Sequence, residues 1–361
     1  MPANKNVKIV QLIDSLEPGG AERMAVNYAN ALANKITFSG LVVTRKEGGL
    51  KEFVNQEVVY LFLNKKGNFD FKALFSFRKY CIQNKITHIH AHSSSFFWAT
   101  LIKATIPKIK IIWHNHLGAS DNLKGYYLFL LKCCSFFFNL TISVNPFLQL
   151  WTDKKLRTSH NIYLANFPSV DFNSNPTSLL KGVEGKRILC LANLRSEKNH
   201  ELILKIAVML KLSNPEWTFH LVGKDFNDAY STKIKKEIIT LDLEKNVYLY
   251  GSQNEVSSLI EQSAFGILTS LSEGLPVSLL EFGIMGKTVV ASNVGDVGRV
   301  IINNETGMLI EGFDEKAFCT AIERLIEEPE YRKYLEKNIK AHVSSHFSEE
   351  AIITTYLSQI Y

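Results

Sequence analysis

Short apolar segments rich in β-branched residues alternate with longer segments of helical periodicity along almost the whole chain. This order is typical of βαβ units, in which helices connect parallel strands. The expected strands fall into two series: Val7–Ile13, Thr37–Val43, Val58–Leu63, Thr87–Ala91, Lys110–Trp113 and Leu140–Val144, then Arg187–Leu191, Thr218–Val222, Val247–Tyr250, Phe265–Thr269 and Thr288–Ala291. The sequence therefore predicts an α/β fold with two doubly wound parallel sheets.

A polar segment separates the two series. Between residues 171 and 186 the apolar content falls and Asn, Ser, Pro and Gly accumulate, as in a linker. We therefore expect a first domain at 1–170, a linker or hinge at 171–186 and a second domain at 187–345. The chain ends with an amphipathic helical pattern within residues 346–361.

The apolar run Gly125–Val144 approaches the length of a membrane span. Lys132 and Asn139 interrupt it, and a lysine at mid-bilayer costs about 2.5–3.5 kcal/mol. We expect a buried helix followed by a strand. Residues 1–13 contain no apolar run long enough for a signal peptide, so a cytoplasmic location is expected.

The composition is that of a globular protein. Of the 361 residues, 46% are hydrophobic and 21% charged, which is enough chain for two domains. The five cysteines form no Cys-x-x-Cys pair and have no ligand spacing with histidine. Neither a disulfide framework nor a zinc site is indicated, and a reducing compartment fits.

Basic residues are concentrated in the first half of the chain. Up to Val170 there are 21 Lys and Arg against 9 Asp and Glu, whereas the remainder has 20 against 26. Such asymmetry indicates an anionic partner for the first half. A solvated basic surface without a partner is the alternative.

The segment Leu271–Lys287 follows a predicted strand and contains a short helix. Pro276 suits the first helical position, and Gly286 suits a stop after the last turn. The N–H groups of Gly274, Leu275 and the first turn would form an anion site at the positive end of this helix.

Glu273 and Glu281 bracket the same helix. At about 1.5 Å rise per residue they stand up to about 12 Å apart. A glycosidase carboxylate pair needs about 5–9.5 Å, so these two suit hydroxyl groups at the two ends of an extended ligand. A helix-capping acid and a surface residue are the alternative interpretation.

Arg195 and Lys198 lie in the loop after the strand Arg187–Leu191. Ligands of open α/β sheets bind at the carboxyl ends of strands. An arginine and a lysine there can neutralise a diphosphate without a metal. Pairing of these two side chains with Glu197 or Glu201 is the alternative.

The first domain opens with a strand, a turn containing Gly19 and Gly20, and a helix. The two glycines would let the backbone approach a phosphate. The spacing is not Gly-x-Gly-x-x-Gly and no P-loop lysine follows, so a nicotinamide or ATP site is not supported.

Histidines cluster at the ends of two neighbouring strands, namely His88, His90, His92, His114 and His116. Alternate residues share a face of a strand, so His114 and His116 could point together into a cleft; burial of one of them with a hydrogen bond is the alternative. No carboxylate or cysteine completes a familiar zinc set. The chain also lacks an Asp-x-Asp motif, so no metal site is predicted.

Together these motifs resemble the retaining glycosyltransferases of family 4, which have the GT-B fold. The resemblance covers most of the chain, from LEPGGAERMAVNYANAL through HIHAH, WHNHLG, TISVNPF and ANLRSEKNHELIL to LTSLSEGLPVSLLEFGIMGKTVVASNVGDVGRVIINNETGMLI. It implies two Rossmann-like domains that face each other across a cleft, with residues 346–361 crossing back to the first domain.

The resemblance also implies roles for single residues. The nucleotide ribose would bind Glu281 and the donor sugar Glu273, with backbone from Gly274, Leu275 and Pro276. The donor diphosphate would bind Arg195 and Lys198, while Gly19, Gly20 and His116 would line the cleft near the reacting sugar. No metal and no cofactor other than the nucleotide-sugar donor is implied.

Two positions depart from the family pattern. Asn193 stands where most relatives have an arginine, which Arg195 can replace. Arg299 stands where many have a glutamate.

The implied activity is sugar transfer to a glycan or lipid-linked acceptor in bacterial cell-surface polysaccharide or lipopolysaccharide synthesis. With no acidic nucleophile in the matched motifs of the first domain, front-face attack explains retention. A nucleotide-sugar epimerase and a degenerate binding module are the alternatives, and no nucleic-acid partner is indicated. The basic first half suggests contact with an anionic membrane, through Lys103–Trp113 or Lys124–Phe138, on the inner face of the cytoplasmic membrane.

Overall fold

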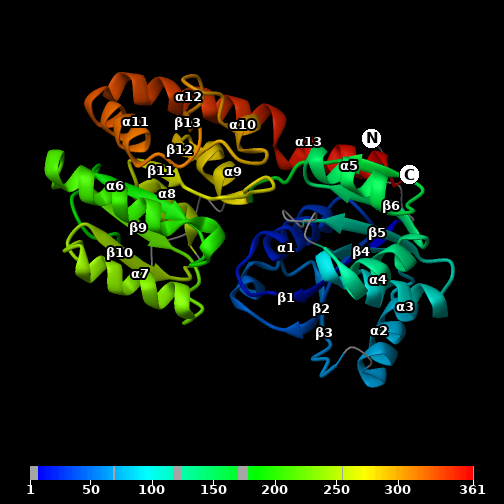
Figure 1. Cartoon of the computed structure of the whole chain (residues 1–361). Helices are drawn as coiled ribbons and strands as arrows, with labels where there is room; N and C mark the ends of the chain where they lie inside the picture. The colour runs from blue at the N-terminus through cyan, green and yellow to red at the C-terminus, as the bar shows by residue number, and fades with distance from the viewer. Residues whose placement is uncertain (1–6, 68–69, 117–122, 170–177, 254, 361) are drawn as a thin grey trace. The chain divides into compact units, whose positions relative to one another are not determined.

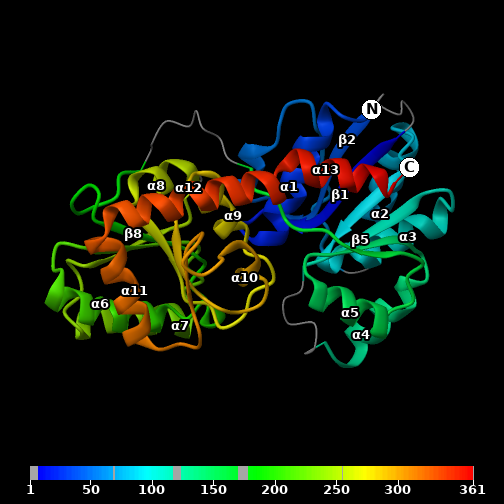
Figure 2. The same cartoon turned by 90° about the horizontal axis from the view of Figure 1, so that it is seen from above.

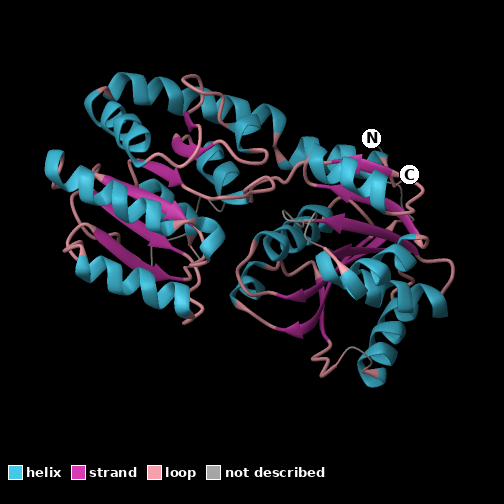
Figure 3. Cartoon of the chain, in the orientation of Figure 1, coloured by secondary structure: helices cyan, strands magenta, loops and turns pink. Residues whose placement is uncertain are grey.

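The computed structural model describes residues 7–67, 70–116, 123–169, 178–253 and 255–360. The chain divides into two compact units (Figure 1). Unit 1 comprises Met1–Phe167 and Glu349–Tyr361, and unit 2 comprises Pro168–Ser348. In each unit, helices cover both faces of one sheet (Figure 3).

Unit 1 is built on a seven-stranded, all-parallel sheet of order β3-β2-β1-β4-β5-β6-β7. The strands are β1 Lys8–Ser15, β2 Phe38–Lys46, β3 Val59–Phe62, β4 His88–His92, β5 Lys110–Asn115, β6 Phe138–Ser143 and β7 Asn161–Tyr163. The helices are α1 Gly20–Ala33, α2 Phe71–Gln83, α3 Phe96–Thr105, α4 Gly125–Ser135, α5 Pro146–Lys155 and α13 Glu349–Ser358.

Unit 2 is built on a six-stranded parallel sheet of order β10-β9-β8-β11-β12-β13. The strands are β8 Arg187–Leu191, β9 Thr218–Val222, β10 Val247–Gly251, β11 Phe265–Leu268, β12 Val289–Ser292 and β13 Met308–Ile310. The helices are α6 His200–Ser213, α7 Ala229–Thr240, α8 Val256–Gln262, α9 Val277–Ile284, α10 Val297–Val300, α11 Glu315–Glu327 and α12 Pro329–His346.

Each sheet reverses its strand order once, between β1 and β4 in unit 1 and between β8 and β11 in unit 2. The prediction of two doubly wound parallel sheets is therefore confirmed. In such sheets the loops at the carboxyl ends of the strands next to the reversal diverge and leave room for a ligand.

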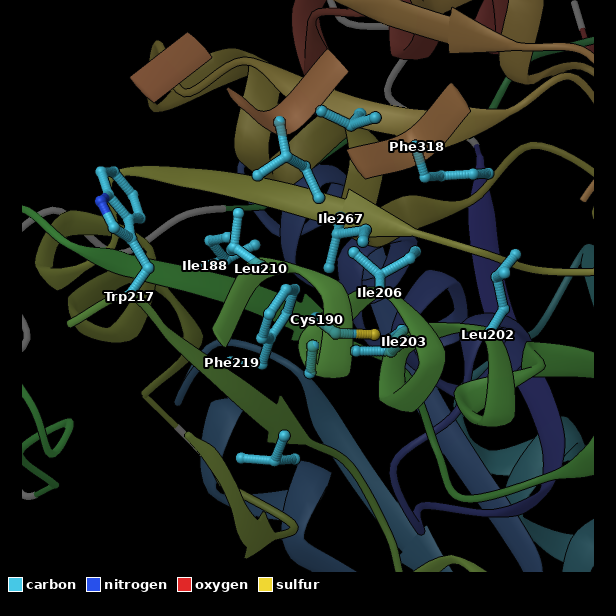
Figure 4. Packing of buried hydrophobic residues seen from close by; sticks show 14 of the residues in the cluster. Ile188, Cys190, Leu202, Ile203, Ile206, Leu210, Trp217, Phe219, Ile267 and Phe318 are labelled. Atoms are coloured by element: carbon cyan, nitrogen blue, oxygen red, sulfur yellow. The ribbon is translucent and has the colours of Figure 1, made fainter. Parts of the chain in front are cut away.

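The core of unit 2 packs α6 against β8, β9 and β11. Figure 4 shows its labelled side chains, among them Ile188, Ile203 and Phe219, pointing toward one another, and all three are at most 1% exposed. Because both faces of these strands are covered, they are continuous apolar runs, which made them recognisable in the sequence.

Helix α4 corrects one prediction. The run Gly125–Val144 does contain a helix followed by the strand β6, but the helix is not buried. Only Leu131, Cys134 and Ser135 of α4 are buried. Tyr126 and Phe129 are exposed, whereas Tyr127, Leu128 and Leu130 are partly buried against the core where α4 packs on α3. No helix among the described residues is long and apolar enough to cross a membrane.

The end of the chain packs into unit 1. Helix α12 ends at His346 and α13 begins at Glu349. Tyr356 of α13 is fully buried, and its hydroxyl is hydrogen-bonded to His90 Nδ1 at 3.0 Å. Of the predicted linker, residues 171–177 lie outside the described residues. Ser178 and Leu180, in its second half, bond Gln253 and Gln262 of unit 2.

Candidate functional site

Two loops at the carboxyl ends of β8 and β11 are joined to each other. The first contains a short 3-10 turn, η4, Ser196–Lys198. The hydroxyl of Thr269, directly after β11, donates to the carbonyls of Lys198 and Asn199, both at 3.1 Å. The N–H of Leu271 donates to the carbonyl of Glu197 at 2.8 Å. The reversal point of this sheet therefore presents one connected surface of loop backbone.

Lys198 and Glu273 meet on this surface. The Lys198 ammonium lies 2.5 Å from Glu273 Oε1, and the Glu273 side chain is only 8% exposed. The structure therefore brings together a cation from the first loop and a carboxylate from the second. A ligand with a diphosphate and a hydroxylated ring can divide this pair, taking the ammonium with its phosphates and the carboxylate with a hydroxyl.

The loop after β12 holds Glu273 in place. The N–H of Asp296 donates to the carbonyl of Gly274 at 3.0 Å. Gly295 has φ +54°, and a Cβ on it would overlap the Glu273 carbonyl oxygen. A residue other than glycine would therefore displace the loop that carries Glu273.

Helix α9 begins at Val277. Pro276 is its N-cap, one position earlier than expected, because its ψ of 123° is extended rather than helical. Gly286 has φ +71° directly after the last turn, so the predicted stop is confirmed. Glu281 is 6% exposed, which excludes the alternative that it is a surface residue. Gly274 and Leu275 precede the helix, and their N–H groups lie at its positive end.

Arg195 is less firmly held than Lys198. Its side chain is 52% exposed, its guanidinium lies 4.5 Å from the centre of the Phe226 ring, and its distance to Glu197 is 3.8 Å. Glu201 pairs with Lys233 instead, at 2.7 Å. Arg195 therefore has the pairing with Glu197 that the alternative interpretation expected, whereas Glu201 does not compete for it.

Asn193 and Arg299, the two departures from the family pattern, have structural neighbours. Asn193 Oδ1 accepts from the N–H of Lys224 at 2.8 Å and so ties the loop after β8 to the loop after β9. Arg299 lies 3.7 Å from Asp296 Oδ2.

Asp296 is a site residue that sequence reasoning missed. Burial raises the pKa of its carboxyl to about 6, and among the described residues its Oδ2 atom has no hydrogen-bond partner. The sequence pattern that could have identified Asp296 is a Gly-Asp pair shortly after the buried strand β12.

Gly19 and Gly20 begin α1 in unit 1. Gly19 is the N-cap with an extended backbone, φ −170°, and Gly20 has open space where a Cβ would lie. The Glu22 carboxylate folds over Gly19. The backbone conformation therefore does not require glycine at either position.

A chain of histidines fills the carboxyl ends of β4 and β5. His90 Nε2 lies 3.1 Å from His114 Nδ1, and His92 Nδ1 lies 3.0 Å from His116 Nε2. His92 Nε2 lies 2.9 Å from Gln11 Oε1. Burial lowers the pKa of His116 to about 3 and holds the pKa of His90, His92 and His114 well below the usual value. All four rings are therefore neutral at pH 7.

These contacts fix the protonation of His116. Gln11 Oε1 can only accept, so His92 donates from Nε2 and its Nδ1 accepts. His116 then donates from Nε2, which leaves its Nδ1 as an acceptor. Nitrogen atoms of His90, His92 and His114 lie within 4.8 Å of one another, a set that could hold a metal ion. The residues after His116, Leu117 and Gly118 of the WHNHLG motif, lie outside the described residues.

Asp14, a half-buried carboxylate near the end of β1, was also missed. Asp14 accepts hydrogen bonds from Thr44, from Lys65 at 2.9 Å and from Ser94 at 2.8 Å. Burial alone would raise the pKa of this carboxyl, but Lys65 and the two hydroxyls outweigh burial and lower it. Lys65 also lies 4.7 Å from the Trp98 ring centre. Both carboxylate oxygens of Asp14 are engaged, so this group is not a free nucleophile.

Comparison with known proteins gives a glycosyltransferase family model for each half of the chain. Residues 18–149 match Glycosyltransferase Family 4, and residues 171–342 match Glycosyl transferases group 1. An uncharacterized glycosyltransferase of Haemophilus influenzae is 27% identical over 343 residues, which are 91% of this chain and 92% of the relative.

Two Escherichia coli relatives have more specific names. An O-antigen biosynthesis glycosyltransferase is 24% identical over 365 residues, 99% of each chain. UDP-Gal:alpha-D-GlcNAc-diphosphoundecaprenol alpha-1,3-galactosyltransferase is 23% identical over 357 residues, 88% of this chain and 87% of the relative. Among solved structures, Anabaena HepE in complex with UDP and glucose aligns with a TM-score of 0.81 at 16% identity, over 98% of this chain and 99% of that one.

Proposed function

The chain belongs to the glycosyltransferases of family 4 and group 1, with relatives in O-antigen biosynthesis, and we propose that it moves a sugar from a nucleoside diphosphate sugar to a glycan or lipid-linked acceptor, with retention and without a metal. The observation that carries the proposal is the Lys198–Glu273 pair beside the N-terminus of α9. It combines a cation for a diphosphate with a carboxylate for sugar hydroxyls.

Departure of the nucleoside diphosphate creates negative charge, and stabilising that charge is the main catalytic task. Hydrogen-bond donors for this charge lie in the loops after β8 and β11. They are the Lys198 ammonium, the exposed Arg195 guanidinium and the N–H groups of Gly274 and Leu275. When the diphosphate takes Lys198, the Glu273 carboxylate is released to accept hydrogen bonds from the donor sugar. Glu281, within α9, binds the ribose hydroxyls.

Retention follows from front-face attack. Asp14 is the carboxylate at the end of β1 in unit 1, and its oxygens are already bonded to Thr44, Lys65 and Ser94. Since Asp14 is not free to form a covalent intermediate, the acceptor hydroxyl loses its proton to the departing diphosphate. His116, with an unprotonated Nδ1, accepts a hydrogen bond from a sugar hydroxyl and orients the donor.

The acceptor and the place of reaction follow from the relatives and the charge. One relative is named for a diphosphoundecaprenol-linked acceptor and the structural neighbour for bound UDP and glucose. A lipid-linked acceptor, a cytoplasmic location and contact of the basic unit 1 with an anionic membrane are therefore part of the proposal. The five cysteines are free thiols, which agrees with a reducing compartment.

The test is transfer with purified full-length chain, a panel of UDP-, GDP- and ADP-sugars and a diphosphate-lipid-linked sugar acceptor, in buffer containing EDTA. The proposal predicts transfer from one donor in EDTA and, by NMR, the same anomeric configuration in donor and product. Inversion would contradict front-face attack, and transfer that needs added divalent metal would contradict metal independence. Donor consumption without an acceptor would favour the epimerase alternative.

A further inference from the structure

Helix α4 carries exposed aromatic side chains on one face. Tyr126 is 75% exposed and Phe129 64%, and after the last turn Phe136 is 60% and Phe137 48% exposed. Tyr126, Phe129 and the exposed Cys133 lie three and four residues apart on one face of α4, and Phe136 and Phe137 follow directly after its last turn. Figure 2 shows α4 at the outside of its unit. We call Tyr126, Phe129, Phe136 and Phe137 the aromatic stripe.

The charges around the aromatic stripe are basic. Lys124 precedes α4, Lys132 lies within it, and the Arg157 guanidinium lies 4.9 Å from the centre of the Phe136 ring. The sequence contains no Asp or Glu from residue 122 to residue 152. A surface that combines large exposed aromatic groups with cations and lacks carboxylates is complementary to an apolar layer beneath anionic groups.

We infer that the aromatic stripe inserts into the interface of an anionic phospholipid bilayer, with α4 parallel to the membrane plane. Lys132 and Arg157 contact lipid phosphates, and Tyr126, Phe129 and Phe137 reach the boundary of headgroups and acyl chains. An 11-residue helix is about 16 Å long, enough to lie in the interface but not to span it. A second copy of the chain is the less suitable occupant, because two copies would bring the same cations together.

The structure also selects between the two membrane-contact segments expected from the sequence. In Lys103–Trp113 the apolar residues Ile111, Ile112 and Trp113 are at most 1% exposed inside the sheet. That segment contains none of the large exposed hydrophobic side chains among the described residues. The inference rests on the membrane contact in the proposed function and names the side chains that make it.

The first test is binding of the full-length chain to vesicles of phosphatidylcholine alone and of phosphatidylcholine mixed with phosphatidylglycerol. We expect binding to the mixed vesicles that weakens with salt, and at least about tenfold weaker binding for Phe129→Ser/Phe137→Ser. The control Phe313→Ser/Tyr334→Ser removes two exposed aromatic groups from unit 2, which are 42% and 50% exposed, and should bind like the unchanged chain. Equal binding by the two double variants, or no binding by the unchanged chain, would overturn the inference.

A second variant serves if the first fails to fold. Phe129→Trp keeps an aromatic group, so its additional fluorescence should shift to shorter wavelength on mixed vesicles and be quenched by brominated acyl chains. Fluorescence that does not respond to the vesicles would overturn the inference. Self-association of the unchanged chain that is lost in Phe129→Ser/Phe137→Ser would also overturn it, because it would assign the aromatic stripe to contact with a second copy. UDP-sugar binding in solution should be unchanged in every α4 variant. If the unchanged chain binds no donor but still binds vesicles, the proposed function fails and the membrane surface stands.

Discussion

The two units share one fold plan but differ in what lies at the carboxyl ends of their strands. Unit 2 has three ionisable side chains there, Lys198, Glu273 and Asp296, on three adjoining loops. Unit 1 has a buried chain of neutral imidazoles at the corresponding place. The same sheet reversal thus supports a charged ligand site in one unit and a rigid polar core in the other.

The two units also differ in net charge and in exposed aromatic side chains. Unit 1 has 21 Lys and Arg against 11 Asp and Glu, and unit 2 has 20 against 24. Phe71, Phe75 and the aromatic stripe belong to unit 1 and are all exposed, whereas Phe313 and Tyr334 are the large exposed aromatic residues among the described part of unit 2. Two units with the same fold plan therefore differ in net charge and in the number of exposed aromatic side chains, which agrees with the proposed division into a donor-binding unit and an acceptor-facing unit.

Acidification should separate the two units most strongly. Burial lowers the pKa of five histidines among the described residues of unit 1, namely His88, to about 4, and His90, His92, His114 and His116. In the described part of unit 2 it lowers the pKa of two, His200 to about 4 and His220 to about 3. Since the unfolded chain binds these protons first, stability is present above about pH 6.5 and is lost as pH falls toward 4. From pH 7 to 5 each histidine removes about 1–2 kcal/mol.

In unit 2 the pKa of Asp296 is raised to about 6, so the folded unit binds that proton before the unfolded chain does. Protonation of Asp296 therefore increases the free energy of unfolding as the pH falls, which opposes the effect of the histidines. Hydrogen exchange of the full chain at pH 7 and 5, corrected for the intrinsic rate, measures the difference. β4 and β5 should lose protection before β8 and β9. Equal loss in both sheets would remove this contrast.

Lys198→Ala should abolish most of the transfer activity. Loss of a preorganised cation at the departing diphosphate costs about 10²- to 10³-fold in rate. The matched control is Lys186→Ala, which breaks another ion pair of unit 2, with Glu216 at 2.9 Å, at the opposite end of β8. Initial rates at saturating donor check both. A comparable loss in the two variants would show that the effect is not specific to the strand ends.

Gly295→Ala should reduce transfer about ten- to hundredfold, because a 1 Å displacement at a reacting centre costs about that much. Gly312→Ala is the control, since it also has positive φ, +71°, but open space for a Cβ. Both variants lose about 1–3 kcal/mol of stability through the backbone, measured as a lower Tm. Only Gly295→Ala should lose activity, and equal activities would mean that the loop carrying Glu273 tolerates movement.

Arg195→Ala should have the smallest effect, less than about tenfold, because an exposed cation contributes about 1 kcal/mol or less. The effect should fall on KM for the donor more than on kcat. If Arg195→Ala matched Lys198→Ala, the arginine would be the main diphosphate ligand and the ranking of the two cations would be reversed.

Much of this fold was predictable because its strands are buried on both faces and are therefore continuous apolar runs. The three-residue strands β7 and β13 were missed, since Asn161–Tyr163 and Met308–Ile310 are too short to show a period. The prediction of a buried helix is wrong for α4, because composition gives the apolar content of Gly125–Ser135 but not which face of the helix has a partner.

The candidate site was predictable where one segment carries the chemistry. Glu273, Gly274 and Glu281 share a short segment, so their grouping could be inferred. The resemblance placed Lys198 and Glu273, 75 positions apart, at the same donor, but the direct contact between them was not predicted. Asp14 and Asp296 were missed because each gains its surroundings from loops that are distant in sequence.

The most direct test of the donor site is a calorimetric titration of the full-length chain with UDP-, GDP- and ADP-sugars in EDTA, repeated on Glu281→Gln and Glu330→Gln. Glu281 is 6% exposed within α9, whereas the Glu330 side chain is 86% exposed. The account predicts metal-free binding of one donor, at least about tenfold weaker in Glu281→Gln and unchanged in Glu330→Gln. Equal affinity in the two variants, or no binding to any donor by the folded chain, would contradict it.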